Sequence, residues 1–196
     1  MFINCPLLLQ HMEKIFLRLR KDLKKKDELR EKSIINSRPI TKHSKQAIYA
    51  IHRNDLGQAE ILIKEAKKGI RELEKLNYFT GAYNAALQEY AEAITYFDYV
   101  KTGKLTSDET LNMDAENYLL GICDLTGELG RRAVFSVVNE KYEEVEKIWK
   151  FCSKIYEEFL KFEFRNSELR KKSDSIKWNL KKIEEILYEL KLRGKL

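Results

Sequence analysis

Residues that interrupt helices are rare in this 196-residue sequence, which contains only two prolines and eight glycines. Their scarcity, in a chain rich in Leu, Ile, Ala, Lys and Glu, favours an all-α protein. No apolar run approaches the roughly 18–20 residues that a helix needs to cross a bilayer. The length is sufficient for one domain with a substantial core, so we predict a single helical domain over residues 1–196.

Cysteine and histidine are also scarce, with three of each. Cys5, Cys123 and Cys152 are odd in number and widely spaced, which fits neither a disulfide framework nor a zinc site. They predict a reducing, cytoplasmic location. The histidines lack the Glu-x-x-His spacing of a di-iron bundle, which argues against redox iron. The sequence also has no Gly-rich phosphate loop and no nucleophilic serine or cysteine constellation.

The charge is unevenly distributed around a net value of +6. Residues 1–54 carry 13 basic and 5 acidic residues, and residues 161–196 carry 11 and 6. Residues 55–160 reverse the balance, with 13 basic and 20 acidic residues. Basic ends that flank an acidic middle suit a phosphodiester substrate. The alternative is that the lysines only cover solvated helix faces.

Apolar residues recur at helical spacing through most of the chain and predict seven helices in one elongated bundle. Pro39 predicts a break, because proline cannot continue a helix interior. Asp55 and Asp114 are predicted N-caps. Residues 80–100 and 115–138 are apolar on nearly all sides and should be central. The predicted helices cover residues 7–35, 40–53, 56–76, 80–100, 115–138, 141–164 and 168–192.

Two short acidic patterns carry the clearest chemistry: Glu89 with Glu92, and Asp124 with Glu128. Each places two carboxylates on one helical face, in a segment that is otherwise apolar or small. Burying ionised carboxylates is costly unless something compensates them. If the two helices are neighbours, the four oxygen ligands can converge on Mg²⁺ or Mn²⁺. Such an ion lowers the pKa of a bound water and so supports phosphodiester hydrolysis.

Basic residues lie close to these acids along the chain. We expect Arg53, Arg131 and Arg132 to contact phosphates of a nucleic acid, without reading its sequence. The alternative is that the four acids are structural and pair with Arg or Lys side chains of other helices.

The segment 116–129, which contains the letters D-L-T-G-E-L, resembles the translin superfamily and is most similar to its translin-associated factor X branch. Residues 37–53, with S-R-P-I-T and I-H-R, and residues 169–194, which end in L-R-G, are also similar to that branch. The resemblance covers about residues 20–194. It implies the translin-like α-α superhelix and, for a compact chain of one type, an archaeal-type member.

Members similar to factor X are Mg²⁺-dependent endoribonucleases that act on single-stranded RNA. The resemblance implies that Glu89, Glu92, Asp124 and Glu128 are the catalytic and metal-binding residues, with Mn²⁺ as a substitute for Mg²⁺. It further implies a homo-oligomer, an octameric barrel, with single-stranded RNA or DNA inside.

Two other functions stay open. Translin itself lacks this acid set and mainly binds nucleic acid, so the chain could be a non-catalytic single-stranded nucleic-acid-binding protein. A helical assembly protein that binds no nucleic acid is the third hypothesis.

Overall fold

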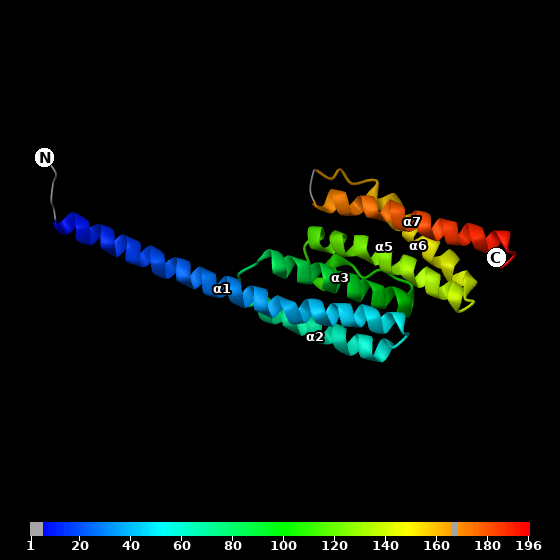
Figure 1. Cartoon of the computed structure of the whole chain (residues 1–196), viewed down its shortest axis with the longest axis horizontal. Helices are drawn as coiled ribbons and strands as arrows, with labels where there is room; N and C mark the ends of the chain where they lie inside the picture. Colours follow the sequence, from blue (N-terminus) through cyan, green and yellow to red (C-terminus); the bar gives the residue numbers. More distant parts are fainter. Residues whose placement is uncertain (1–5, 166–167) are drawn as a thin grey trace.

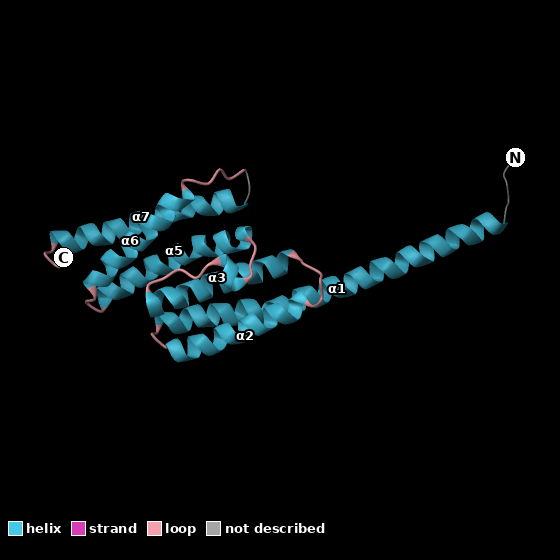
Figure 2. Cartoon of the chain, turned by 180° about the vertical axis from the view of Figure 1, so that it is seen from behind, coloured by secondary structure: helices cyan, strands magenta, loops and turns pink. Residues whose placement is uncertain are grey.

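The computed structural model describes residues 6–165 and 168–196 of the chain, and Figure 1 shows their path. Within these ranges the only regular elements are helices (Figure 2), so the predicted all-α class is confirmed. The helices are α1 (Pro6–His52), α2 (Leu56–Glu74), α3 (Gly81–Thr102), α4 (Asp108–Leu111), α5 (Ala115–Val138), α6 (Tyr142–Phe159) and α7 (Glu168–Leu192).

Helices α3 and α5 form the centre of the bundle (Figure 1), as their apolar composition predicts. Helix α3 packs against α1, α2 and α5, and α5 packs against α3, α6 and α7. The predicted N-caps are confirmed: the Asp55 carboxylate accepts from the Gln58 backbone N–H, and Asp114 accepts from that of Asn117. These caps fix where α2 and α5 begin.

The predicted break at Pro39 is wrong, because α1 runs through it as one helix of 47 residues. Proline inside a helix costs about 3 kcal/mol through its missing N–H and a ring clash. Packing of the residues on both sides of Pro39 offsets that cost. Ile40 is 1% exposed and lies against Gly69 of α2, and the Ser33 hydroxyl is hydrogen-bonded to that of Thr80 at 3.0 Å.

Two smaller differences follow from local packing. The predicted loop before Asn112 contains the single-turn helix α4, which Ser107 caps. The predicted helix over 141–164 ends at Phe159, which leaves Phe162 in a loop and half-exposed. Cys123 and Cys152 are buried free thiols, as expected, whereas Cys5 lies outside the described residues.

The N-terminal half of α1 projects from the bundle as an arm (Figure 1). Every residue from 9 to 28 is exposed. Several are large and apolar, which is unusual for a solvated helix. Even so, none of the helices described has the length and apolar character to span a membrane.

Candidate metal and nucleic-acid site

The site lies where α3 and α5 cross at close range. Gly121 of α5 makes this crossing possible, since a Cβ there would stand 2.6 Å from the Ala91 Cβ and 2.9 Å from the Gln88 carbonyl oxygen of α3. The Gln88 side-chain amide also donates to the Asn117 side-chain oxygen of α5 at 3.0 Å. Close contact of the two backbones brings both acidic patterns to the same region of the bundle.

We expect Gly121→Ala to force α3 and α5 apart, because the added methyl meets backbone as well as a side chain. Overpacking of this kind costs about 1–3 kcal/mol. Gly130→Ala is the matched control, because nothing lies within 4 Å of a Cβ at that position of the same helix. It should stabilise the protein by about 0.5–1 kcal/mol through helix propensity. Urea unfolding measures the change in unfolding free energy of each variant. Equal changes for the two variants would contradict the close crossing of α3 and α5.

The structure places the other three predicted acids within electrostatic range of Glu92. Glu92 is 8% exposed, and its burial, reinforced by the charges of Asp124, Glu128 and Glu89, raises the pKa of its carboxyl to about 9. Burial also raises the pKa of Asp124, against the opposing effect of Lys172. Without a bound cation, Glu92 is therefore protonated at neutral pH. Acids that repel one another in this way attract a cation.

Lysines from two other helices reach the same acids. The Lys45 ammonium of α1 lies 3.2 Å from a Glu89 oxygen, and the Lys172 ammonium of α7 donates to Asp124. This agrees with the predicted alternative in which the acids pair with Arg or Lys side chains of other helices, here with two lysines. The Lys45 side chain is 63% exposed, and such exposed pairs contribute only about 0–1 kcal/mol.

The donor set fits a hard divalent cation, because all four side chains offer carboxylate oxygens. In the side-chain conformations of the described residues, no three His, Cys, Asp or Glu groups are close enough to hold one ion together. The Lys45 and Lys172 ammonium groups instead supply the positive charge beside Glu89 and Asp124. A metal would therefore bind by replacing these ammonium groups.

Glu128 has a different partner, the imidazole of His52 at the end of α1. His52 Nε2 donates to Glu128 Oε2, and the His52 side chain is only 3% exposed. The Arg131 guanidinium lies 3.9 Å from the same oxygen. These roles of His52, Lys45 and Lys172 were not predicted from the sequence. The available signal was the spacing of His52, which follows the buried Ile51 directly and the buried Ile48 by about one helical turn.

The three arginines predicted to contact phosphates lie in different environments. The Arg53 guanidinium stacks over Tyr49 at 4.8 Å and lines a hollow of about 280 Å³ together with Lys141. Arg131 is half-exposed beside Glu128. The Arg132 guanidinium is mostly buried and donates to Glu144 at 2.7 Å, so it is committed to another carboxylate.

The Translin family profile matches residues 28–194 of this chain. The chain belongs to the Translin family. Among curated relatives, the translin-associated protein X homolog of Schizosaccharomyces pombe is 32% identical over 209 residues, covering 93% of this chain and 89% of that protein. An uncharacterized protein of Methanocaldococcus jannaschii is 31% identical over 182 residues, covering 87% and 82%.

Solved structures of similar proteins confirm the translin-like architecture. The crystal structure of apo-NeC3PO superposes with a TM-score of 0.81 at 26% identity, covering 96% of this chain and 97% of that one. The structure of AfC3PO in complex with duplex RNA superposes with a TM-score of 0.83 at 25% identity, covering 91% and 97%.

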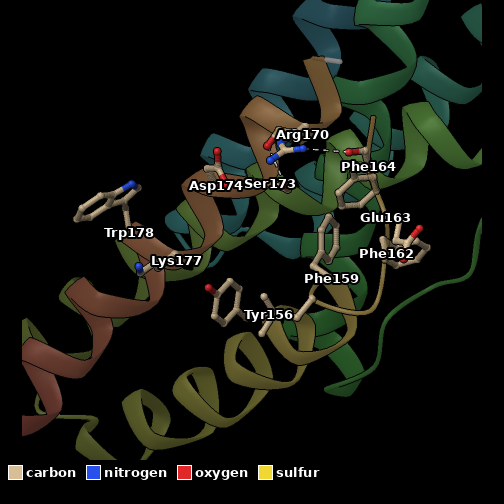
Figure 3. Close-up of a pocket in the computed structure, with 11 residues that line it drawn as sticks. Tyr156, Phe159, Phe162, Glu163, Phe164, Arg170, Ser173, Asp174, Lys177 and Trp178 are labelled. Atoms are coloured by element: carbon tan, nitrogen blue, oxygen red, sulfur yellow. Dashed lines mark hydrogen bonds between the residues drawn. The ribbon is translucent and has the colours of Figure 1, made fainter. Parts of the chain in front are cut away.

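Another hollow of this translin-family protein has none of the four acids in its lining, and Figure 3 shows the residues that do line it. It measures about 680 Å³ and lies between α7 and the C-terminal end of α6 with the loop after it. Phe162 and Phe164 stack there at 5.3 Å, and Arg170 donates to the Phe164 carbonyl oxygen. Its lining mixes aromatic rings with charges of both signs, so size alone does not make it the reaction site.

Proposed function

We propose that this translin-family protein is a Mg²⁺-dependent endoribonuclease that hydrolyses single-stranded RNA. The observation that carries the proposal is the gathering of Glu89, Glu92, Asp124 and Glu128 from two crossing helices, with Glu92 buried against the charges of the other three. The fold shared with C3PO structures and the relative named translin-associated protein X homolog support it. Four neighbouring carboxylates that are partly buried cost free energy, and a bound catalytic cation would offset that cost here.

The four carboxylates would hold Mg²⁺, or Mn²⁺ in its place, which when bound supplies an activated water and neutralises charge on the phosphate. Glu128 and Glu89 are each about one-quarter exposed and so within reach of solvent. Either can accept the proton of the attacking water as general base. Arg53 and Arg131 are available to contact phosphates on either side of the scissile bond.

AfC3PO was solved in complex with duplex RNA. For this chain we propose that single strands are cut faster, because a flexible strand can bend its backbone into the α3–α5 site.

Incubation of the purified protein with end-labelled RNA tests this function. We expect cleavage of a single strand in Mg²⁺ or Mn²⁺, slower cleavage of the matched duplex, and none in excess EDTA. Cleavage that survives the chelator would refute the metal mechanism. Equal rates on both RNAs would refute the single-strand preference and leave the metal mechanism standing.

The ion pairs of Lys45 and Lys172 favour a second function, a nucleic-acid-binding protein without catalysis. In that case the acids are structural and no RNA is cut with or without Mg²⁺. RNA binding that weakens steeply with salt would identify this function. Absence of binding would instead support an assembly protein that uses no nucleic acid.

The arm of α1 supports the proposed homo-oligomer, for which we retain the octamer as the expected form. Five of its seven large exposed apolar residues, all except Ile15 and Leu17, follow alternating intervals of three and four: Leu9, Met12, Phe16, Leu19 and Leu23. This is the heptad spacing by which helices pack against one another. A second copy of the chain presents the same stripe and can cover it symmetrically.

We expect the double substitution Leu19→Glu and Leu23→Glu to reduce the assembled mass, because charges in an apolar helix–helix seam are strongly unfavourable. Light scattering coupled to size exclusion measures it. The control is Arg20→Glu with Lys24→Glu, at exposed positions beside the stripe on the same arm. Equal masses for the wild type and the first variant would show that the arm is not an interface.

A further inference from the structure

The imidazole of His52 lies in a series of polar side chains that leads from Glu128 to Tyr96 and Arg132. One ring nitrogen, Nε2, contacts Glu128 Oε2, and the other, Nδ1, lies 3.2 Å from the Tyr96 hydroxyl. The Arg132 guanidinium is close enough to Tyr96 to lower the pKa of its hydroxyl, against the larger raising effect of burial, and it donates to Glu144. The His52 side chain is 3% exposed and Tyr96 is fully buried, so these two side chains are largely shielded from bulk water.

From Tyr96 to Glu128 the hydrogen-bond donors point in one direction, from the Tyr96 hydroxyl to His52 and from His52 to Glu128. The Arg132 cation attracts the Tyr96 oxygen and repels its hydrogen, so the Tyr96 O–H turns toward His52 Nδ1. A neutral imidazole that accepts at Nδ1 carries its hydrogen on Nε2, and that N–H faces the Glu128 carboxylate. Tyr96 therefore selects the tautomer that donates to Glu128.

Packing holds the ring in place as well as hydrogen bonds do. The His52 ring lies 5.1 Å from the Tyr96 ring and 5.8 Å from the Phe135 ring, between α3 and α5. The contact occupies Glu128 Oε2, and the structure gives Glu128 Oε1 no partner among the described residues. One oxygen is thus fixed by the protein while the other stays available to a cation or to water.

We propose that His52 is a positioning residue for Glu128, and that Tyr96 and Arg132 set its orientation and tautomer. This inference rests on the proposed function, because it assigns Glu128 a task that requires a fixed carboxylate. It gives Arg132 a role in place of the predicted phosphate contact. Removal of such an outer partner commonly costs about 10–100-fold in metal affinity or activity.

Three variants test the proposal: His52→Leu, His52→Gln and Tyr96→Phe. We expect His52→Leu to lower kcat and to weaken Mg²⁺ binding, each by about tenfold or more, with little change in the KM for RNA. His52→Gln should recover most of both, since its amide N–H can donate from a similar place. Tyr96→Phe should give an intermediate loss. His43→Gln, on the opposite face of α1, is the control and should leave both quantities unchanged.

Calorimetric titration with Mg²⁺ is measured beside the cleavage rates, so that binding is read independently of activity. If the wild type cleaves RNA and His52→Leu shifts only the melting temperature, His52 is merely structural and the inference is overturned. Failure of His52→Gln to recover more than His52→Leu would overturn it too. A wild type that neither cleaves RNA nor binds Mg²⁺ would refute the proposed function itself, and the inference with it.

Discussion

Replacing Glu128 with Gln should lower the rate of RNA cleavage by about 10³-fold, the usual scale for losing a group that acts in the transition state. The substitution removes one negative charge and the basicity of the carboxylate. Its amide oxygen can still accept the hydrogen bond of the buried His52. We therefore expect the fold to remain intact, with a melting temperature equal to or slightly above that of the wild type.

Single-turnover cleavage of labelled RNA and a thermal melt, recorded on the same preparation, measure the two effects. Glu116→Gln is the matched control, an exposed acid in the first turn of the same helix α5. It should cleave at the wild-type rate. Unfolding of the Glu128→Gln protein would mean that its carboxylate completes a structural ion pair with His52. Full activity would remove Glu128 from the catalytic set.

Replacing Glu92 with Gln should stabilise the metal-free protein by about 3 kcal/mol at pH 7, because the pKa of this carboxyl is raised from 4.5 to about 9 by folding. Between these two pH values the unfolded chain releases the proton and the folded protein retains it. The stability of the wild type therefore falls as pH rises, by about 1.4 kcal/mol per pH unit. The amide has no proton to lose, so it avoids that loss.

The advantage of Glu92→Gln should consequently vanish below pH 4.5 and grow toward pH 9. Urea unfolding in EDTA at several pH values measures it. Mg²⁺ should reduce the difference in unfolding free energy between Glu92→Gln and the wild type at neutral pH, since the ion stabilises only the protein that retains all four acids. Glu65→Gln, at an exposed position on α2, should show no such pH dependence. A constant advantage at all pH values would mean that Glu92 is ionised in the folded protein.

Two helices were predicted from the sequence with the bounds that the structure gives them. The predicted range 115–138 coincides with α5, and 168–192 with α7. Asp114 provides a side-chain cap for α5 that is readable from the sequence alone. The prediction failed at Pro39, where the local preference for a break was overridden by packing of Ile40 on Gly69, a residue almost thirty positions away.

The candidate site was likewise predicted only in part from the sequence. Its four acids are visible in the sequence because their spacing on a helix is local and their apolar surroundings are unusual for carboxylates. Their partners are not visible. Lys45 and His52 come from α1 and Lys172 from α7, and nothing in the spacing of these residues pairs them with an acid of α3 or α5.

Local sequence patterns were enough to predict that this protein is helical, which two helices are central, and which carboxylates share a helical face. These properties depend on neighbours within one or two turns. The tertiary structure alone decided that Gly121 lets α3 and α5 cross at contact distance, that Glu92 is buried among like charges, and that His52 is held between Tyr96 and Glu128. Burial and pairing are set by helices that meet only after the chain has folded, and local patterns do not encode which helices meet.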